Sequence, residues 1–370
     1  MKKTYSRLFT LLFCLFIGGV AVLSLCLPDR DFSPEENRTL QQAPAFSLSS
    51  VMDGTFMSKM ESYISDQILW RDGWVHLKAA GERLLGKKEN NDIFFCGDTL
   101  VARVAEPSPE RMEKNMEYLD ALCENVEVPV HFGLIPSAAT VWADKLPTGA
   151  DTADETAWIR ELYGRTNAQT IDFASALSAH REEDVFYRTD HHWTSLGACY
   201  GAGALADALG LPGKTPDAYE KTTVTTDFYG TNYSASGAFW VSPDAIETFV
   251  SGDNVAVETH FTSQGETGTL YVPEKLEIKD KYSFFLGGNQ PLCVIRTETE
   301  GERVLLIRDS YSDSLSPFLT ELFSEIHMVD LRYFRESIQN YVRDNRIDRV
   351  IVLYGFSTYA EDTNQFLLTQ

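Results

Sequence analysis

The pattern of apolar and polar positions sets an N-terminal segment apart from the rest of the 370-residue chain. The apolar run from Leu8 to Leu27 is roughly 20 residues long, which matches the thickness of a bilayer core. Basic residues precede this run and acidic residues follow it. The positive-inside rule therefore predicts a cytoplasmic tail over residues 1–7, a transmembrane helix over residues 8–27 and an extracytoplasmic body.

A cleaved signal peptide is the alternative interpretation of the same segment. Signal peptides have a shorter apolar region, and Ser24-Leu25-Cys26 lacks the small residue expected just before a lipidated cysteine. The charges that flank the run argue against a buried core helix. We therefore expect an uncleaved signal anchor and a single-pass location in the cell membrane.

Polar and then helical patterns follow the anchor. Residues 28–50 are rich in Pro, Asp, Glu, Asn and Gln and have little apolar periodicity, which is typical of a stalk. From Val51 to Leu85, apolar residues recur at helical spacings, so we expect one or two amphipathic helices after a turn at Asp53-Gly54. These helices would open an extracytoplasmic domain over residues 51–370.

Short apolar runs in this domain alternate with helical stretches. The run from Val130 to Ile135 lies between two prolines, as expected of a buried strand that feeds a loop. Three later runs have the same character: Val304–Ile307, Ile326–Val329 and Val350–Tyr354. Helical stretches over 317–323 and 334–345 separate these three runs, which predicts βαβ units. The expected fold class is α/β, with a doubly wound parallel sheet flanked by helices.

Residues 214–302 have a different composition, rich in Thr, Gly, Ser and aromatic residues and without long helical periodicity. This pattern predicts a β-rich insertion in the α/β domain.

Composition narrows the function classes. The chain is 44% hydrophobic and 23% charged, as in a folded globular protein. Its formal charge of −22, without a basic cluster, argues against a nucleic-acid partner. The six cysteines form no CxxC pair, which argues against a thiolate metal site, and four of them, outside the apolar segment, are free to pair or to remain thiols: Cys96, Cys123, Cys199 and Cys293.

The first segment with candidate chemistry reads Thr189-Asp190-His191-His192-Trp193-Thr194. Thr194 is suited to cap the helix that follows, so Asp190 and His192 lie on the extended approach to it with side chains on the same side. A carboxylate placed in this way orients an imidazole and steadies the imidazolium of a general base. Metal binding through Asp190, His191 and His192 is a rival interpretation, and a structural histidine pair packed on Trp193 is another.

The second segment runs from the strand at Val304–Ile307 into Arg308-Asp309-Ser310-Tyr311. Ser310 then lies at the carboxyl end of a parallel strand, where open α/β sheets bind their ligands. A nearby base would activate its hydroxyl, and amides at the helix start would stabilise an oxyanion. The competing interpretation is that Asp309 and Ser310 only cap the next helix.

Two further positions are candidates for substrate or oxyanion contacts. Asn289, after Gly287-Gly288, is placed either to donate to an oxyanion or to complete an ordinary turn. Arg332 follows a strand end, where it either binds substrate oxygen and supports the site or forms a surface salt bridge.

With these segments, the sequence resembles the DHHW protein family, whose namesake tetrad is Asp190-His191-His192-Trp193 here. The resemblance covers nearly all of the chain after the anchor. Supporting segments occur in the family's order: Glu36-Asn37-Arg38, Asp53-Gly54, Asp66 to Arg71, Tyr229-Gly230-Thr231, Gly287-Gly288-Asn289, Arg308 to Tyr311 and Asp330 to Phe334.

The family is similar in turn to the SGNH-like alginate and exopolysaccharide O-acetyltransferases, in which an Asp-x-His motif precedes the nucleophilic serine. The resemblance implies an SGNH-hydrolase-like fold with Asp190 as orienting acid, His192 as base and Ser310 as nucleophile. Beside this triad, we expect oxyanion or substrate contacts from Asn289, Arg332 and Tyr311. Arg308 stands where many SGNH proteins have glycine, a departure that bears on activity more than on fold.

The implied activity is ping-pong acetyl transfer to a hydroxyl of a cell-surface or exported polysaccharide, with no metal and no cofactor. A membrane acyltransferase is the expected source of acetyl groups. Two alternatives stay open: a carbohydrate acetyl esterase with the same triad, since water competes for the acyl-enzyme, and a non-catalytic glycan-binding or scaffold protein.

Overall fold

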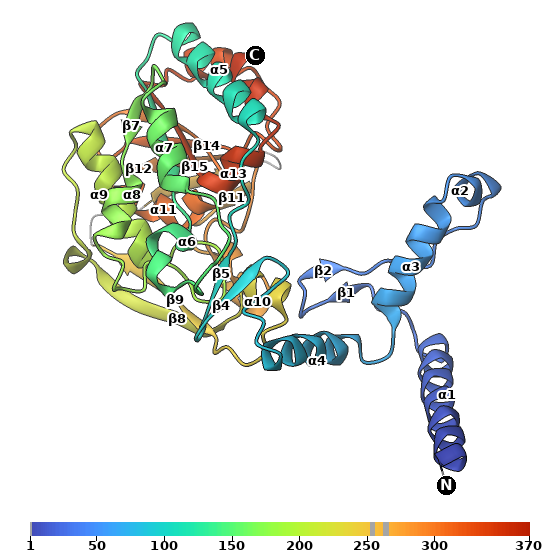
Figure 1. The fold of residues 1–370 in the computed structure, drawn as a ribbon. Coiled ribbons are helices and arrows are strands. Elements are labelled where there is room, and N and C mark those ends of the chain that lie inside the picture. The colour runs from blue at the N-terminus through green and yellow to red at the C-terminus, as the bar shows by residue number, and fades with distance from the viewer. Residues whose placement is uncertain (1, 252–255, 262–265) are drawn as a thin grey trace. The chain divides into compact units, whose positions relative to one another are not determined.

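The computed structural model describes residues 2–251, 256–261 and 266–370. The chain divides into two compact units, one formed by Met1–Asn90 and Ser234–Phe239 and the other by Asn91–Tyr233 and Trp240–Gln370 (Figure 1). We call them the N-terminal unit and the α/β unit. Their division at Asn90 does not coincide with the domain boundaries expected from the sequence, after residues 27 and 50.

The N-terminal unit begins with an apolar helix, α1 (Lys2–Cys26). Its segment Thr4–Cys26 is long and apolar enough to cross a membrane, as both signal sequences and anchors are. Regular structure continues through the segment expected to be a stalk, where β1 (Phe32–Ser33) pairs antiparallel with β2 (Arg38–Thr39).

Three helices follow β2: α2 (Leu48–Met52), α3 (Thr55–Gln67) and α4 (Arg71–Leu84). The expected amphipathic helices are α3 and α4. The predicted turn before them is confirmed, because Asp53 Oδ1 accepts a hydrogen bond of 2.9 Å from Thr55 N. Gly54 has a left-handed φ of 82°, which glycine adopts at little cost.

The α/β unit is built on an eight-stranded sheet in the order β11-β10-β12-β14-β13-β15-β6-β7. Five neighbouring strands are parallel: β14 (Glu325–Val329), β13 (Arg303–Arg308), β15 (Arg349–Gly355), β6 (Val130–Ile135) and β7 (Gln169–Ile171). All four predicted strands are confirmed, and β6 has the predicted bounds. Side chains of Val304 to Ile307 are fully buried, as expected for a parallel strand covered on both faces.

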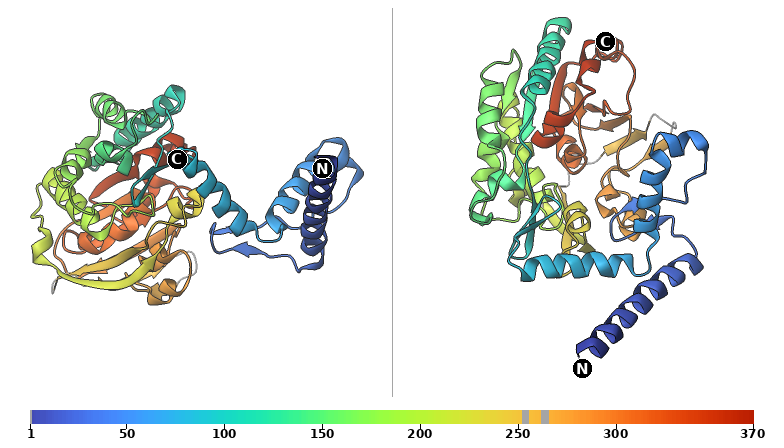
Figure 2. Two further views of the ribbon diagram at one scale, coloured as in Figure 1. Left: turned by 60° about the horizontal axis from the view of Figure 1, so that its bottom comes forward. Right: turned by 45° about the vertical axis from the view of Figure 1, so that its right-hand side comes forward.

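Helices cover both faces of this sheet (Figure 2). Phe132 of β6 packs on Tyr359 of α13 (Phe356–Glu361), whereas a Cβ on the next residue, Gly133, would meet Phe173 of α8 (Phe173–Ser178). Successive strand residues point to opposite faces, so α13 and α8 lie on opposite sides of the sheet. The α/β fold with a mostly parallel central sheet is therefore confirmed.

Further α-helices and strands of the α/β unit flank this sheet: β4 (Ile93–Cys96), β5 (Thr99–Ala102), α5 (Pro109–Asn125), α6 (Ala138–Val141), α7 (Glu155–Tyr163), α9 (Ser195–Leu209), β8 (Glu220–Phe228), β9 (Asp244–Val250), α11 (Tyr311–Leu319) and α12 (Ile338–Asp344). The short helix α10 (Thr231–Ser236) begins in this unit.

The segment 214–302 is β-rich, as predicted, but most of its strands do not form a separate insertion. β8 and β9 pair with each other, whereas β10 (Ala256–Phe261), β11 (Glu266–Gly268) and β12 (Leu292–Thr297) extend the central sheet as an antiparallel edge. Residues 252–255 and 262–265 of this segment lie outside the described residues.

The helix expected over 317–323 lies earlier, as α11 (Tyr311–Leu319). Proline is favoured in the first turn of a helix, so Pro317 predicts a helix start. In the structure Pro317 lies inside α11, and Ser316 Oγ donates to the Asp313 carbonyl at 2.8 Å. Helix α12 lies within the expected 334–345. All six cysteines are thiols.

Candidate active site

A short loop carries the predicted acid and imidazole. An antiparallel bridge between Phe186 and Trp193 closes the loop, and Thr194 begins α9 directly after it. Thr194 Oγ1 accepts from Gly197 N at 3.2 Å, which confirms the predicted cap. The bridge and the cap fix both ends of the loop, so the orientation of residues 187–192 is well defined.

Asp190 and His192 are hydrogen-bonded inside this loop. Asp190 Oδ1 lies 2.6 Å from His192 Nδ1 and accepts the His192 backbone N–H at 3.0 Å. Asp190 Oδ2 accepts from Thr231 N at 2.8 Å and from Thr231 Oγ1 at 3.0 Å. Every acceptor position of this buried carboxylate is used, so its orientation toward the imidazole is fixed.

The electrostatic environment keeps Asp190 ionised. Burial alone would raise the pKa of Asp190, which is 2% exposed, but nearby His191 and His192 and the Thr231 N–H stabilise the carboxylate. The net effect is a pKa well below the ordinary value of 3.8. An ionised partner favours the histidine tautomer with its proton on Nδ1.

The segment Tyr229-Gly230-Thr231 supplies this support from the far side of the carboxylate. A Cβ at Gly230 would lie 2.2 Å from Asp190 Cβ and 2.3 Å from Asp190 Oδ2, so only glycine fits there. The sequence offered this segment as a family feature without a role. Nothing local in it indicates contact with a residue about 40 positions earlier.

Ser310 lies between the end of β13 and the start of α11. Its Oγ is 2.8 Å from His192 Nε2, so the structure brings Ser310, His192 and Asp190 into one hydrogen-bonded chain. The Ser310 side chain makes no capping hydrogen bond and is half-buried. It is therefore available to a second molecule.

The capping interpretation applies to Asp309 instead. Asp309 Oδ1 accepts from Tyr311 N at 3.1 Å, and Oδ2 accepts from Gly355 N at 2.8 Å. Burial raises the pKa of Asp309, while these N–H donors oppose the rise. A Cβ at Gly355 would lie 2.7 Å from the Tyr311 ring. Asp309 thus ties the serine turn to the end of β15.

Aromatic residues hold the imidazole and the serine turn together. The Tyr282 ring stacks on His192 at 3.8 Å with an 8° interplanar angle, and Tyr282 Oη donates to the Ser310 carbonyl at 3.0 Å. Trp193 Nε1 donates to the Tyr311 carbonyl at 2.9 Å. A Cβ at Gly201 of α9 would lie 2.6 Å from the Trp193 ring, so this glycine makes room for the ring. Nothing in the sequence around Tyr282 indicates its contact with His192.

Asn289 and Arg332 meet beside β13. Asn289 Oδ1 accepts from Arg332 Nη2 at 3.2 Å and from Arg308 Nη1 at 3.4 Å. Arg332 is also bound to Asp330, with Nη2 at 2.6 Å from Oδ2. Two guanidinium groups thus hold the Asn289 carbonyl oxygen, which leaves the amide nitrogen as the donor. The roles predicted for Asn289 and Arg332 in binding stay predictions.

Tyr311, expected to contact substrate, has its hydroxyl bonded to the chain itself. Its Oη donates to the His191 carbonyl at 2.5 Å, and its ring lies 5.1 Å from the His192 ring. Burial raises the pKa of Tyr311 well above 10. These contacts place Tyr311 as a support of the loop, and a substrate contact from its hydroxyl would require breaking that hydrogen bond.

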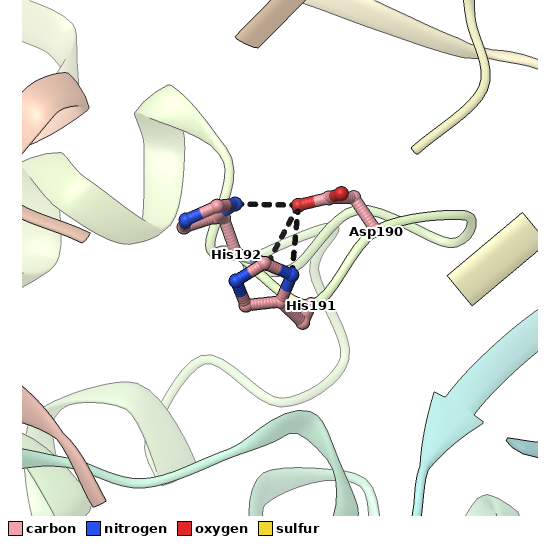
Figure 3. Close-up of side chains that lie close together, drawn as sticks. All are labelled: Asp190, His191 and His192. Carbon is pink, nitrogen blue, oxygen red and sulfur yellow. Dashed lines mark hydrogen bonds and ion pairs between the residues drawn. The ribbon is translucent and has the colours of Figure 1, made fainter. Parts of the chain in front are cut away.

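The metal interpretation is testable against the same geometry. Possible ligand atoms of Asp190, His191 and His192 lie within 4.8 Å of one another (Figure 3). Both ring nitrogens of His192 already have partners, and His191 Nδ1 lies 2.7 Å from Thr231 Oγ1. A metal ion would have to displace Ser310 or Asp190 from His192, so the donor set fits a hydrogen-bonded chain better than a metal.

Comparisons with known proteins concern the family and the fold of the chain. The model of the DHHW protein family matches residues 134–329. A DHHW family protein from Eubacterium siraeum is 24% identical, with a TM-score of 0.67, over 75% of this chain and 95% of that chain. Bacillus cereus PatB1 is 20% identical, with a TM-score of 0.61, over 74% and 98%.

A second structure of PatB1, with a sulfonyl adduct, is 18% identical, with a TM-score of 0.60 over the same shares of the two chains. No curated protein matches the sequence. These identities show a shared fold. Because the family model covers more than half of the 370 residues and includes the loop that carries Asp190 to Trp193, the chain belongs to the DHHW protein family.

Proposed function

We propose that this chain is an extracytoplasmic O-acetyltransferase that modifies a cell-surface or exported polysaccharide, held at the membrane by α1 as an uncleaved anchor. Ser310 acts as nucleophile, His192 as general base and Asp190 as the orienting acid. The similarity to the SGNH-like polysaccharide O-acetyltransferases supports the reaction class, and the fold shared with PatB1 is compatible with it. The donor is an acetyl ester supplied by a membrane acyltransferase.

The observation that carries the proposal is the chain of two hydrogen bonds, 2.6 Å from Asp190 to His192 and 2.8 Å from His192 to Ser310. With the Nδ1 proton donated to Asp190, His192 Nε2 accepts the hydroxyl proton of Ser310. The serine oxygen then attacks the acetyl carbonyl, and the imidazolium returns its proton to the leaving group. The product of this half-reaction is acetyl-Ser310.

The oxyanion in this step needs N–H donors. Tyr311 N and Ser312 N already donate, to Asp309 Oδ1 and to the Asp309 carbonyl. Ser310 N has no hydrogen-bond partner within the described ranges, so we assign it as one donor. The amide nitrogen of Asn289 is the second, since its carbonyl oxygen is held by Arg308 and Arg332.

The second half-reaction reverses the first. A glycan hydroxyl gives its proton to His192 Nε2 and attacks acetyl-Ser310, and the serine leaves with the proton returned by the imidazolium. Water in place of the glycan would make the protein an esterase. Every step uses groups of this chain and its two substrates.

Intact-mass analysis after incubation with an activated acetyl ester tests the proposal. We expect one acetyl adduct on the full chain, absent in Ser310→Ala and His192→Ala. Ser312→Ala is the matched control, because Ser312 lies two residues away, is fully buried and has no partner for its hydroxyl among the described residues. This variant should keep the adduct.

Adding oligosaccharide to the acetylated protein then separates the outcomes. Transfer to sugar supports the transferase, and release as acetate alone would make the chain an esterase. No adduct with any donor, together with glycan binding that survives Ser310→Ala, would replace the enzyme by a binding protein.

A further inference from the structure

The loop between α3 and α4 in the N-terminal unit has an unusual conformation. Trp70 adopts φ 62° and ψ 31°, a left-handed conformation that is rare for a bulky residue, and 80% of its surface is exposed. Such a conformation persists only where surrounding contacts impose it. Both the left-handed backbone of Trp70 and the exposure of its indole therefore require an explanation.

An ionic cluster lies at the base of the loop. Asp66 accepts from Arg38 Nη1 at 2.9 Å and from Arg38 Nη2 at 2.5 Å, and Glu36 pairs with both Arg38 and Arg71. Trp74 Nε1 donates to the Leu69 carbonyl at 2.9 Å. These acidic and basic residues come from two segments of the family resemblance that the acetyl-transfer site does not use.

The loop and its flanking turns also pack along α1. Leu69 N donates to Ser24 Oγ at 2.8 Å, and the Phe16 and Trp74 rings meet edge-to-face with centroids 6.1 Å apart. Phe16 precedes Cys26, the last residue of α1, by ten positions, or about 15 Å along the helix. This is about half of the ~30 Å hydrocarbon core. With α1 across a bilayer, Trp74 therefore lies among acyl chains of the outer half.

An apolar cavity separates α1 from α3. It has a volume of about 510 Å³, and its lining includes Phe16, Val20, Ile64, Ile68 and Trp74. Its lining also includes Ser24, Tyr63 and Gln67, and each of these polar side chains has a partner. Gln67 Nε2 donates to the Arg30 and Gln41 carbonyls, Tyr63 Oη donates to Asp29, and Ser24 Oγ donates to the Val20 carbonyl. Lipid in this cavity would therefore meet no unsatisfied side-chain donor from these three residues.

We propose that the segment Tyr63–Trp74, here called the elbow, is embedded in the outer leaflet of the membrane, with phospholipid acyl chains filling the cavity beside α1. Trp70 then lies at the lipid–water interface, where tryptophan is enriched in membrane proteins. Ile64, 60% exposed, faces acyl chains rather than water. The inference rests on the proposed uncleaved anchor and is independent of the acetyl-transfer chemistry.

Quenching of tryptophan fluorescence by brominated lipids tests the elbow. The full chain is reconstituted into phosphatidylcholine–phosphatidylglycerol vesicles with bromines placed near the headgroup end or near the methyl end of the acyl chains. We expect Trp70→Phe to remove most of the quenching by the shallow bromines and Trp74→Phe to remove quenching by the deeper ones. Trp158→Phe, in the α/β unit and hydrogen-bonded to Glu106, is the matched control and should change neither.

Flotation of the same vesicles after an alkaline wash distinguishes failure of the anchor from failure of the elbow. Chain that floats, with quenching that neither elbow variant changes, would overturn the elbow and leave the anchor standing. Chain that does not float would overturn both the anchor and the elbow. Neither result bears on acetyl-Ser310, which is measured separately by intact mass.

Discussion

Two buried pairs beside Ser310, Asp190–His192 and Arg308–Asp313, differ in how fully their hydrogen-bonding groups are satisfied. Asp190, in the His192 loop, accepts four hydrogen bonds. Arg308, at the end of β13, lies 2.8 Å from Asp313 Oδ1 and is fully buried, yet its Nε and Nη2 have no hydrogen-bond partner among the described residues. Both pairs are out of water, but only the first is fully compensated.

This contrast separates a pair suited to chemistry from a pair suited to positioning. A satisfied carboxylate has one orientation and a fixed charge, which an orienting acid requires. A buried pair with unpaired N–H groups carries a desolvation cost, which is tolerated where the group holds something else in place. Arg308 holds the Asn289 carbonyl oxygen, so its presence in place of a glycine has a structural reason.

The largest expected effect separates the two adjacent histidines. His192→Ala should lower the rate of acetyl-Ser310 formation by on the order of 10⁴-fold or more, because the serine loses its base. His191→Ala should keep the rate within about tenfold, since the His191 ring, 40% exposed, bonds Thr231 rather than Ser310. Stopped-flow acetylation followed by mass analysis measures both. An equal loss in the two variants, together with a wild-type rate that falls on chelation and returns with an added divalent cation, would favour the metal interpretation.

Asp190→Asn should come next, with a loss of on the order of 10³- to 10⁴-fold, because an amide no longer selects the reactive tautomer of His192. The same substitution changes the pH dependence of stability. Since folding lowers the pKa of Asp190, its contribution is fully present above about pH 4 and is lost as the pH falls below that value. Unfolding in denaturant from pH 6 to pH 2 should show a smaller loss for Asp190→Asn than for wild type. Parallel curves would mean that the carboxylate is not stabilised by folding.

Single and double substitution of the Arg308–Asp313 pair should differ in their effect on the free energy of unfolding. Arg308→Met leaves Asp313 buried without its cation and should cost about 3–5 kcal/mol of unfolding free energy. Arg308→Met with Asp313→Leu should recover most of this loss, because no charge remains buried. The control is Arg343→Met, whose pair with Asp344 is exposed and should cost less than about 1 kcal/mol. A double variant as unstable as the single one would show that the lost stability does not come from an unpaired buried charge.

Local patterns in the sequence identified the elements that depend on near neighbours. The apolar run of β6 and the cap at Thr194 involve residues within a few positions, and both could be predicted. The loop Asp190 to His192 also orients itself locally, through a bond between residues two positions apart. Ser310 could be placed near it because parallel strands end at one edge of the sheet.

Contacts between distant segments could not be predicted in the same way. Tyr282 stacks on His192 across about 90 positions, and Thr231 bonds Asp190 across about 40. A tyrosine in an aromatic run and a threonine after a glycine have ordinary local explanations. Only the folded chain shows that these side chains support the acid and the imidazole.

The smallest expected effect concerns Thr231, which supports Asp190 with two donors. Thr231→Val removes the hydroxyl bond of 3.0 Å to Asp190 Oδ2 and keeps the backbone N–H bond of 2.8 Å. One hydrogen bond to a charged group, with a second donor retained, should change the acetylation rate by about tenfold. Thr231→Ser keeps the hydroxyl and should stay close to wild type. A loss in Thr231→Val as large as that in Asp190→Asn would show that the hydroxyl, and not the backbone N–H, holds the carboxylate. A loss in Thr231→Ser as large as that in Thr231→Val would show that packing of the Thr231 methyl group is the support instead.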